Sequence, residues 1–134
     1  TDAIVEAGRA LLSAEFRRFA AHLEQLTGRT LTADALRRGV SMVNAKRAAM
    51  HRLARLRHAN PAPISGLDAL LANQVFFYDD PQRFTDSVNK LCDELEQRIE
   101  STTGVANGDA PRIVISGCPM AVPNWKLPWI IDVR

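Results

Sequence analysis

The chain has 134 residues, 46% of them hydrophobic, which is enough for one small domain with a buried core. Its net charge of +2 is small, and an aromatic content of 6% disfavours a surface that stacks nucleic-acid bases. No run approaches the roughly 18 apolar residues of a membrane span, and the early acids of TDAIVEAGRALL are not typical of a signal peptide, so we expect a cytoplasmic protein with neither a nucleic-acid nor a membrane partner.

Two long helices are predicted to open the chain, at residues 2–27 and 33–58. Apolar residues in the first recur at spacings of mostly three and four, which is typical of an amphipathic helix. They are Val5, Leu12, Phe16, Phe19, Leu23 and Leu26. Gly28 stands where a left-handed C-terminal cap is wanted, and Thr32 is the expected N-cap of the second helix. The second helix is expected to bury one face, made of Leu36, Val40, Val43, Met50, Leu53 and Leu56.

Two shorter helices are predicted next. The prolines of residues 60–63 stop the second helix, and Ser65 is expected to cap a third helix that ends near residue 77. Asp80 followed by Pro81 predicts the start of a fourth helix, because a capping side chain and a proline at the first position favour initiation. The apolar face of this helix consists of Phe84, Val88, Leu91, Leu95 and Ile99.

The pattern changes after a polar, glycine-bearing linker at residues 104–111. Three β-branched residues predict a short buried strand over residues 112–116, and a helix is expected within residues 124–134. We therefore predict a mostly α fold: a four-helix domain at 1–103, then the first strand and helix of an incomplete, flavodoxin- or Rossmann-like α/β domain at 112–134. A single strand needs partners, so we expect the chain to be a piece of a larger protein.

The charges are unevenly distributed. Residues 35–58 hold seven basic side chains and no acid, whereas residues 79–100 hold seven acids and three bases. One interpretation is that the two helices pack with opposite charges facing each other. The alternative is a basic surface for phosphate groups on a nucleotide, a CoA tail or a nucleic acid. The chain would then be a non-catalytic helical module that binds a partner protein or a polyanion.

The turn after the predicted strand is the candidate functional site, because ligands gather at the carboxyl ends of strands in open α/β sheets. Gly117 and Pro119 suit a tight turn, and such a turn, which also contains Ser116, can present backbone N–H groups to an anion. Asn124 is a suitable cap for the helix that follows.

The chain has two cysteines, Cys92 and Cys118, and no CxxC or HxxxH spacing, so it forms neither a disulfide framework nor a zinc site alone. Cys92 lies beside the apolar face of the fourth helix and is expected to be a core thiol. Cys118 as a nucleophile would want a base, and the histidines at 22, 51 and 58 are distant in sequence. The alternative is a small residue packed under the turn.

Three stretches carry a family resemblance: FAAHLEQLTGRTLTADALRRGVSMVNAKRAAMHRLARLR, NPAPISGLDALL and PRIVISGCPMAVPNWKLPWIID. Together they cover nearly the whole chain. They resemble the subunits of 2-hydroxyacyl-CoA dehydratases and benzoyl-CoA reductases, including the related double-cubane cluster proteins.

The resemblance implies a subunit of a homo- or heterodimer that holds a 4Fe-4S cluster through cysteine thiolates. An ATP-dependent activator protein would supply a low-potential electron for dehydration or reduction of an acyl-CoA. On this basis Ser116, Gly117, Cys118, Pro119 and Asn124 would lie near the cluster or the substrate, with Cys118 a candidate ligand. Because this chain lacks the cysteines to hold a cluster alone, we expect no cofactor in it and no activity from it in isolation.

Overall fold

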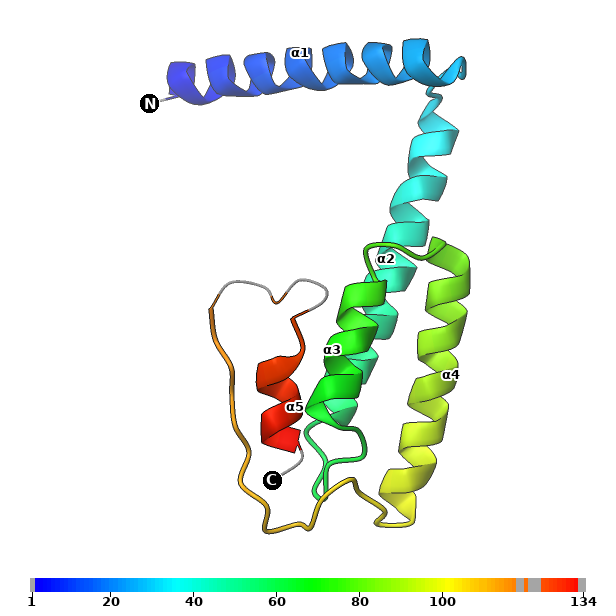
Figure 1. Ribbon diagram of the computed structural model, residues 1–134. Helices are drawn as coiled ribbons and strands as arrows, with labels where there is room; N and C mark the ends of the chain where they lie inside the picture. Colours follow the sequence, from blue (N-terminus) through cyan, green and yellow to red (C-terminus); the bar gives the residue numbers. More distant parts are fainter. Residues whose placement is uncertain (1, 118–119, 121–123, 133–134) are drawn as a thin grey trace. The chain divides into compact units, whose positions relative to one another are not determined.

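A computed structural model describes residues 2–117, 120 and 124–132 and contains five helices in these ranges (Figure 1). They are α1 (Asp2–Thr27), α2 (Ala33–Leu56), α3 (Gly66–Val75), α4 (Pro81–Glu100) and α5 (Lys126–Asp132). The chain divides into two compact units, Thr1–Val40 and Ser41–Arg134, and the division falls within α2. The mostly α character predicted from the sequence is therefore confirmed.

Local signals define the helix ends in the first unit. Gly28 has a φ of +66°, a conformation that costs glycine little, and its N–H donates to the carbonyl of Glu24 at 2.9 Å. Thr32 accepts a hydrogen bond from the N–H of Ala35 through its side chain at 3.1 Å. The predicted C-terminal cap of the first helix and N-cap of the second are both confirmed.

Helix α1 forms over the predicted residues, yet none of its residues is buried. The aromatic members of its apolar stripe, Phe16 and Phe19, are 63% and 60% exposed. The periodicity thus predicted the helix correctly, but the stripe has no packing partner within the described first unit.

The hydrophobic core lies in the second unit, where the latter part of α2, α3 and α4 run side by side with alternating direction (Figure 1). Its fully buried residues come from α2, the loop before α3, and α4: Ala49, Leu53, Ile64, Phe84, Val88, Cys92 and Leu95. Met50, Leu56, Ala72, Phe76 and Leu91 pack against this cluster. Removal of this apolar surface from water is the main stabilising contribution to the unit.

Helices α3 and α4 both begin at the predicted caps. The Ser65 hydroxyl accepts from the N–H of Asp68 at 2.9 Å. The Asp80 carboxylate accepts from the N–H groups of Gln82 and Arg83 at 3.1 and 2.9 Å, and Pro81 occupies the first turn. Each carboxylate or hydroxyl satisfies helix N–H groups that have no partner within the helix.

The predicted buried face of the second helix is only partly correct. Helix α2 ends at Leu56, short of the predicted residue 58, and its buried residues are Lys46, Ala49 and Leu53. Leu36 and Val40 remain 51% and 59% exposed, since these positions belong to the first unit and lie outside the core.

The prediction of a buried strand at residues 112–116 is wrong. This segment forms no strand, and its central residue, Val114, is 89% exposed. A strand needs a neighbour to satisfy its backbone groups, and the described part of the chain offers none. Arg112 instead attaches the segment through its side chain, which donates to the backbone carbonyls of Arg57, at 2.9 Å, and Ala59.

Residues 112–134 were predicted to form the first strand and helix of an α/β domain. The strand is absent, and the helix spans Lys126–Asp132, within the predicted residues 124–134. The linker at 104–111 and the domain boundary placed there stay predictions. No helix in the described ranges combines the length and the apolarity that crossing a membrane demands.

Candidate functional site

The predicted site lies on an exposed segment that follows the core helices. Ser116 and Gly117 are exposed, and Gly117 has a φ of +144°, which strains any residue with a Cβ. Nothing lies within 4 Å of a Cβ built at this glycine, so its requirement is conformational and not steric. Cys118 and Pro119 lie outside the described residues.

One buried amide connects this segment to the helical core. Gln74, near the end of α3, is 6% exposed. Its Nε2 donates to the carbonyl of Met120 at 3.1 Å, and its Oε1 accepts from the indole Nε1 of Trp125 at 2.7 Å. A side-chain amide suits both tasks because it carries a donor and an acceptor. Gln74 thereby holds a point two residues beyond Cys118 and a point just before α5.

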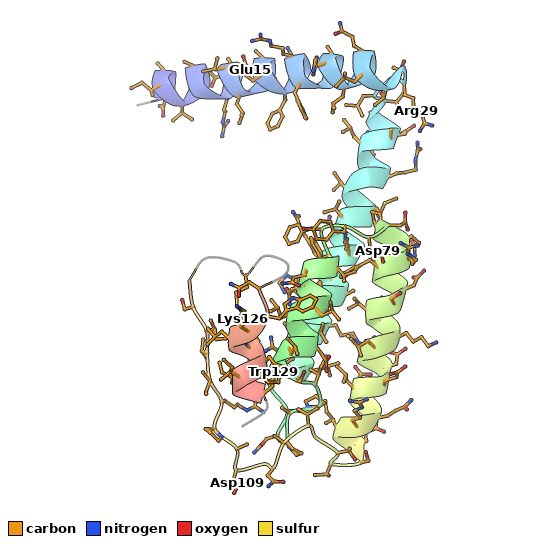
Figure 2. The ribbon with its side chains drawn as sticks, viewed as in Figure 1. Glu15, Arg29, Asp79, Asp109, Lys126 and Trp129 are labelled. Atoms are coloured by element: carbon orange, nitrogen blue, oxygen red, sulfur yellow. The ribbon has the colours of Figure 1, made fainter. Side chains whose placement is uncertain are left out.

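A carboxylate fixes the other end of α5. Asp132 accepts from the N–H groups of Gly66 and Leu67 at 3.3 and 2.6 Å, at the N-terminus of α3. Anions are favoured there by the unpaired N–H groups and the helix dipole. Contacts at both ends therefore align α5 along α3, and Figure 2 marks Lys126 and Trp129 on this short helix.

Asn124 is exposed but does not cap α5 as predicted. The helix begins at Lys126, and the N–H of Trp129 donates to the carbonyl of Trp125 at 3.0 Å. Since the N-cap residue supplies the first helical carbonyl, Trp125 occupies that position. The indole of Trp125, 40% exposed, joins α3 through Gln74.

The described residues do not suit an iron–sulfur cluster. They include no group of three or more His, Cys, Asp or Glu able to hold a metal ion. Cys92 is fully buried in the apolar core, and this burial raises the pKa of its thiol, which disfavours the thiolate that ligates metals. The expectation that Cys92 is a core thiol is confirmed.

The basic region of α2 faces acids on α4 at one position. The Arg52 guanidinium binds Asp93 at 2.6 Å and Glu96 at 2.8 and 3.2 Å, and it also donates to the carbonyl of Asn89 at 3.3 Å. Hydrogen bonds to Glu96 and then Asp93 raise the pKa of Arg52. Packing of opposite charges across two helices is confirmed here, and it neutralises one cation of the predicted basic face.

Sequence reasoning missed a buried cation. Lys46 is 8% exposed, donates from Nζ to the carbonyl of Phe76, and lies 4.3 and 4.9 Å from the ring centroids of Phe76 and Phe84. Such a cation over aromatic faces is a favourable contact. The available signal was its position on the same helix face as Ala49 and Leu53, which follow it at spacings of three and four residues. For Gln74 the signal was a polar amide within the apolar run ALLANQVFF.

The chain is similar to known proteins in two comparisons. A family model described as 2-hydroxyglutaryl-CoA dehydratase, D-component, matches residues 2–134. The chain is also similar to a putative dehydratase subunit, YjiM, of Escherichia coli, with 30% identity over 116 residues. That alignment covers 86% of this chain but only 30% of the relative, so the chain spans about a third of the relative's length.

Proposed function

The chain belongs to the 2-hydroxyglutaryl-CoA dehydratase D-component family, and from this membership we propose that it is part of an enzyme subunit acting on CoA thioesters. The reaction would be dehydration of a 2-hydroxyacyl-CoA or reduction of an aromatic acyl-CoA, driven by ATP-dependent electron transfer. The observation that carries the proposal is the family match over residues 2–134, nearly the entire chain.

The family's enzymes depend on iron–sulfur clusters. Because the described residues offer no such site, we propose that other parts of the subunit supply most of the ligands, with Cys118 the candidate from this segment. Partners in the proposal are a second subunit, an ATP-dependent activator protein and an acyl-CoA. The family match supports a cluster and these partners for the whole subunit, of which this chain is a part.

Within that subunit, we assign this chain a positioning role. The buried amide of Gln74 holds Met120 and Trp125, and Asp132 holds the far end of α5 on α3. These bonds would fix the position of the chain shortly after Cys118. A rigid support of this kind is what a reacting centre requires from its surroundings.

The test is anaerobic loading of the full-length subunit, together with its partner subunit, with iron and sulfide. We expect bound iron, the visible absorbance of an iron–sulfur cluster and, with activator and ATP, turnover of a 2-hydroxyacyl-CoA or an aromatic acyl-CoA. A correctly folded complex that binds no iron would contradict the proposal.

Cys118 is tested separately by alanine substitution. We expect Cys118→Ala to lower the iron bound per subunit, because a lost thiolate weakens cluster binding. Cys92→Ala is the matched control, since Cys92 lies in the apolar core and should leave the iron content unchanged. Equal iron content in both variants would remove Cys118 from the ligand set while leaving the proposed function in place.

A further inference from the structure

A hollow of about 400 Å³ lies within the second unit, between α2 and the end of α3. Its volume falls in the roughly 300–1,000 Å³ range of small-molecule sites. Three of its lining residues are basic and four are large and apolar. They are Arg47, His51 and Arg57, and Met50, Leu53, Phe76 and Phe77. Among the described residues, no acid lines it.

The two arginines of the hollow differ from the neighbouring Arg52. Arg52 is neutralised by two acids of α4, whereas neither Arg47 nor Arg57 forms a salt bridge with any residue in the described ranges. Both are exposed; Arg47 lies on α2, and Arg57 directly follows Leu56, the last residue of that helix. The hollow is therefore complementary to an anion with more than one charged group.

An aromatic platform accompanies these cations. Phe77 is 80% exposed and meets Phe76 edge to face, with the ring centroids 5.4 Å apart. Phe76 is in turn held by Lys46, whose Nζ lies 4.3 Å from the ring centroid, and by a T-shaped contact with Phe84, with the centroids 5.5 Å apart. Phe77, which is largely exposed and contacts Phe76, therefore suits stacking by a flat base.

We propose that this hollow binds a phosphorylated adenosine, with Phe77 stacking on the base and Arg47 and Arg57 contacting phosphate groups. Two sources carry this chemistry: the adenosine end of a CoA thioester and a free adenine nucleotide. The first source rests on the proposed function, and the binding step itself requires neither iron nor an activator.

The test is calorimetric titration of the full chain with CoA, ADP and inorganic pyrophosphate. We expect CoA or ADP to bind more tightly than pyrophosphate, which lacks the base. Tighter binding of CoA than of ADP assigns the site to the thioester substrate, and the reverse order assigns it to a free nucleotide. Either order supports the site.

Substitutions locate the binding. The double variant Arg47→Ala/Arg57→Ala should weaken the affinity for the tighter ligand by at least about tenfold, because charge-assisted phosphate contacts are strong. Phe77→Ala should weaken the same ligand and leave pyrophosphate unchanged. Arg55→Ala is the matched control, since Arg55 is an exposed cation of α2 that does not line the hollow. All substituted residues are exposed, and circular dichroism checks that the variants fold.

The proposal is overturned if none of the three ligands binds, if pyrophosphate binds as tightly as CoA and ADP, or if Arg55→Ala loses as much affinity as the double variant. A subunit that loads iron and turns over its substrate, yet binds no ligand through these residues, would contradict this site alone. A chain that binds CoA here but whose full-length subunit takes up no iron would contradict the proposed function alone.

Discussion

Helices α1 and α4 are both long and amphipathic, but only α4 buries its apolar face. Helix α1 has 26 residues and none is buried, whereas α4 has 20 residues and buries five. Helices in proteins gain most of their stability from tertiary packing, so the two units should differ in what stabilises them. Helix formation was thus readable from local sequence in both units, and burial followed only where a second apolar surface was available.

The largest expected contrast is between two phenylalanines. Phe84→Ala should lower the free energy of unfolding by roughly 3–5 kcal/mol, because Phe84 is 2% exposed in the core and its loss leaves a cavity. Phe16→Ala should change it by no more than about 0.5 kcal/mol, because Phe16 is already in contact with water. Urea unfolding followed by circular dichroism measures both. A Phe16→Ala loss as large as that of Phe84→Ala would show that α1 is packed in solution.

The buried amide of the site gives the next contrast. Gln74→Ala should cost about 1–3 kcal/mol, because the indole N–H of Trp125 and the carbonyl of Met120 lose their partner. Gln25→Ala on exposed α1 should stay within about 0.5 kcal/mol. Tryptophan fluorescence during unfolding reports the change, and hydrogen exchange of α5 should accelerate in the Gln74 variant. Unchanged exchange there would mean that Asp132 alone holds α5 on α3.

Two helix caps provide a subtler comparison. Asp80→Ala should lower the unfolding free energy by about 1 kcal/mol, because two N–H groups of α4 lose their acceptor within a cooperatively folded unit. Thr32→Ala removes the corresponding acceptor from α2 in the first unit. Since no core is attached to that end, we expect faster amide exchange near residue 35 with an unchanged midpoint. A shift of the midpoint by Thr32→Ala would show that the two units unfold together.

These caps are also where the sequence was most informative about the fold. Gly28, Thr32, Ser65 and Asp80 each satisfy groups within a few residues, so their roles depend on local chemistry alone. The strand at 112–116 was predicted wrongly because β-branched residues express a preference that only a neighbouring strand can fulfil.

The candidate site was predictable only in part, for the same physical reason. The positive φ of Gly117 is a local property that its residue type permits, whereas Cys118 and Pro119 lie outside the described residues and the turn through them stays a prediction. The bond between Gln74 and Trp125 joins residues 51 positions apart, and that between Asp132 and Leu67 spans 65. Such pairs depend on how helices pack, which periodicity alone does not specify.

The smallest expected effect concerns pH and belongs to the second unit alone, since residues 1–40 contain no cysteine. Burial raises the pKa of the Cys92 thiol above its usual value near 8.5, an effect opposed by Arg52 and reinforced by Glu96 and Asp93. The folded state then holds this proton more tightly than the unfolded state does. The resulting stability is fully present below the pKa of the unfolded state and is lost as the pH rises through the pKa of the folded state.

Urea midpoints from pH 7 to about 10 should therefore fall more steeply for the wild type than for Cys92→Ala. If the midpoints of the two proteins fall with pH at the same slope, the thiol is in contact with water in the folded state. The contrast between the buried face of α4 and the exposed face of α1 would then be smaller than the structure indicates.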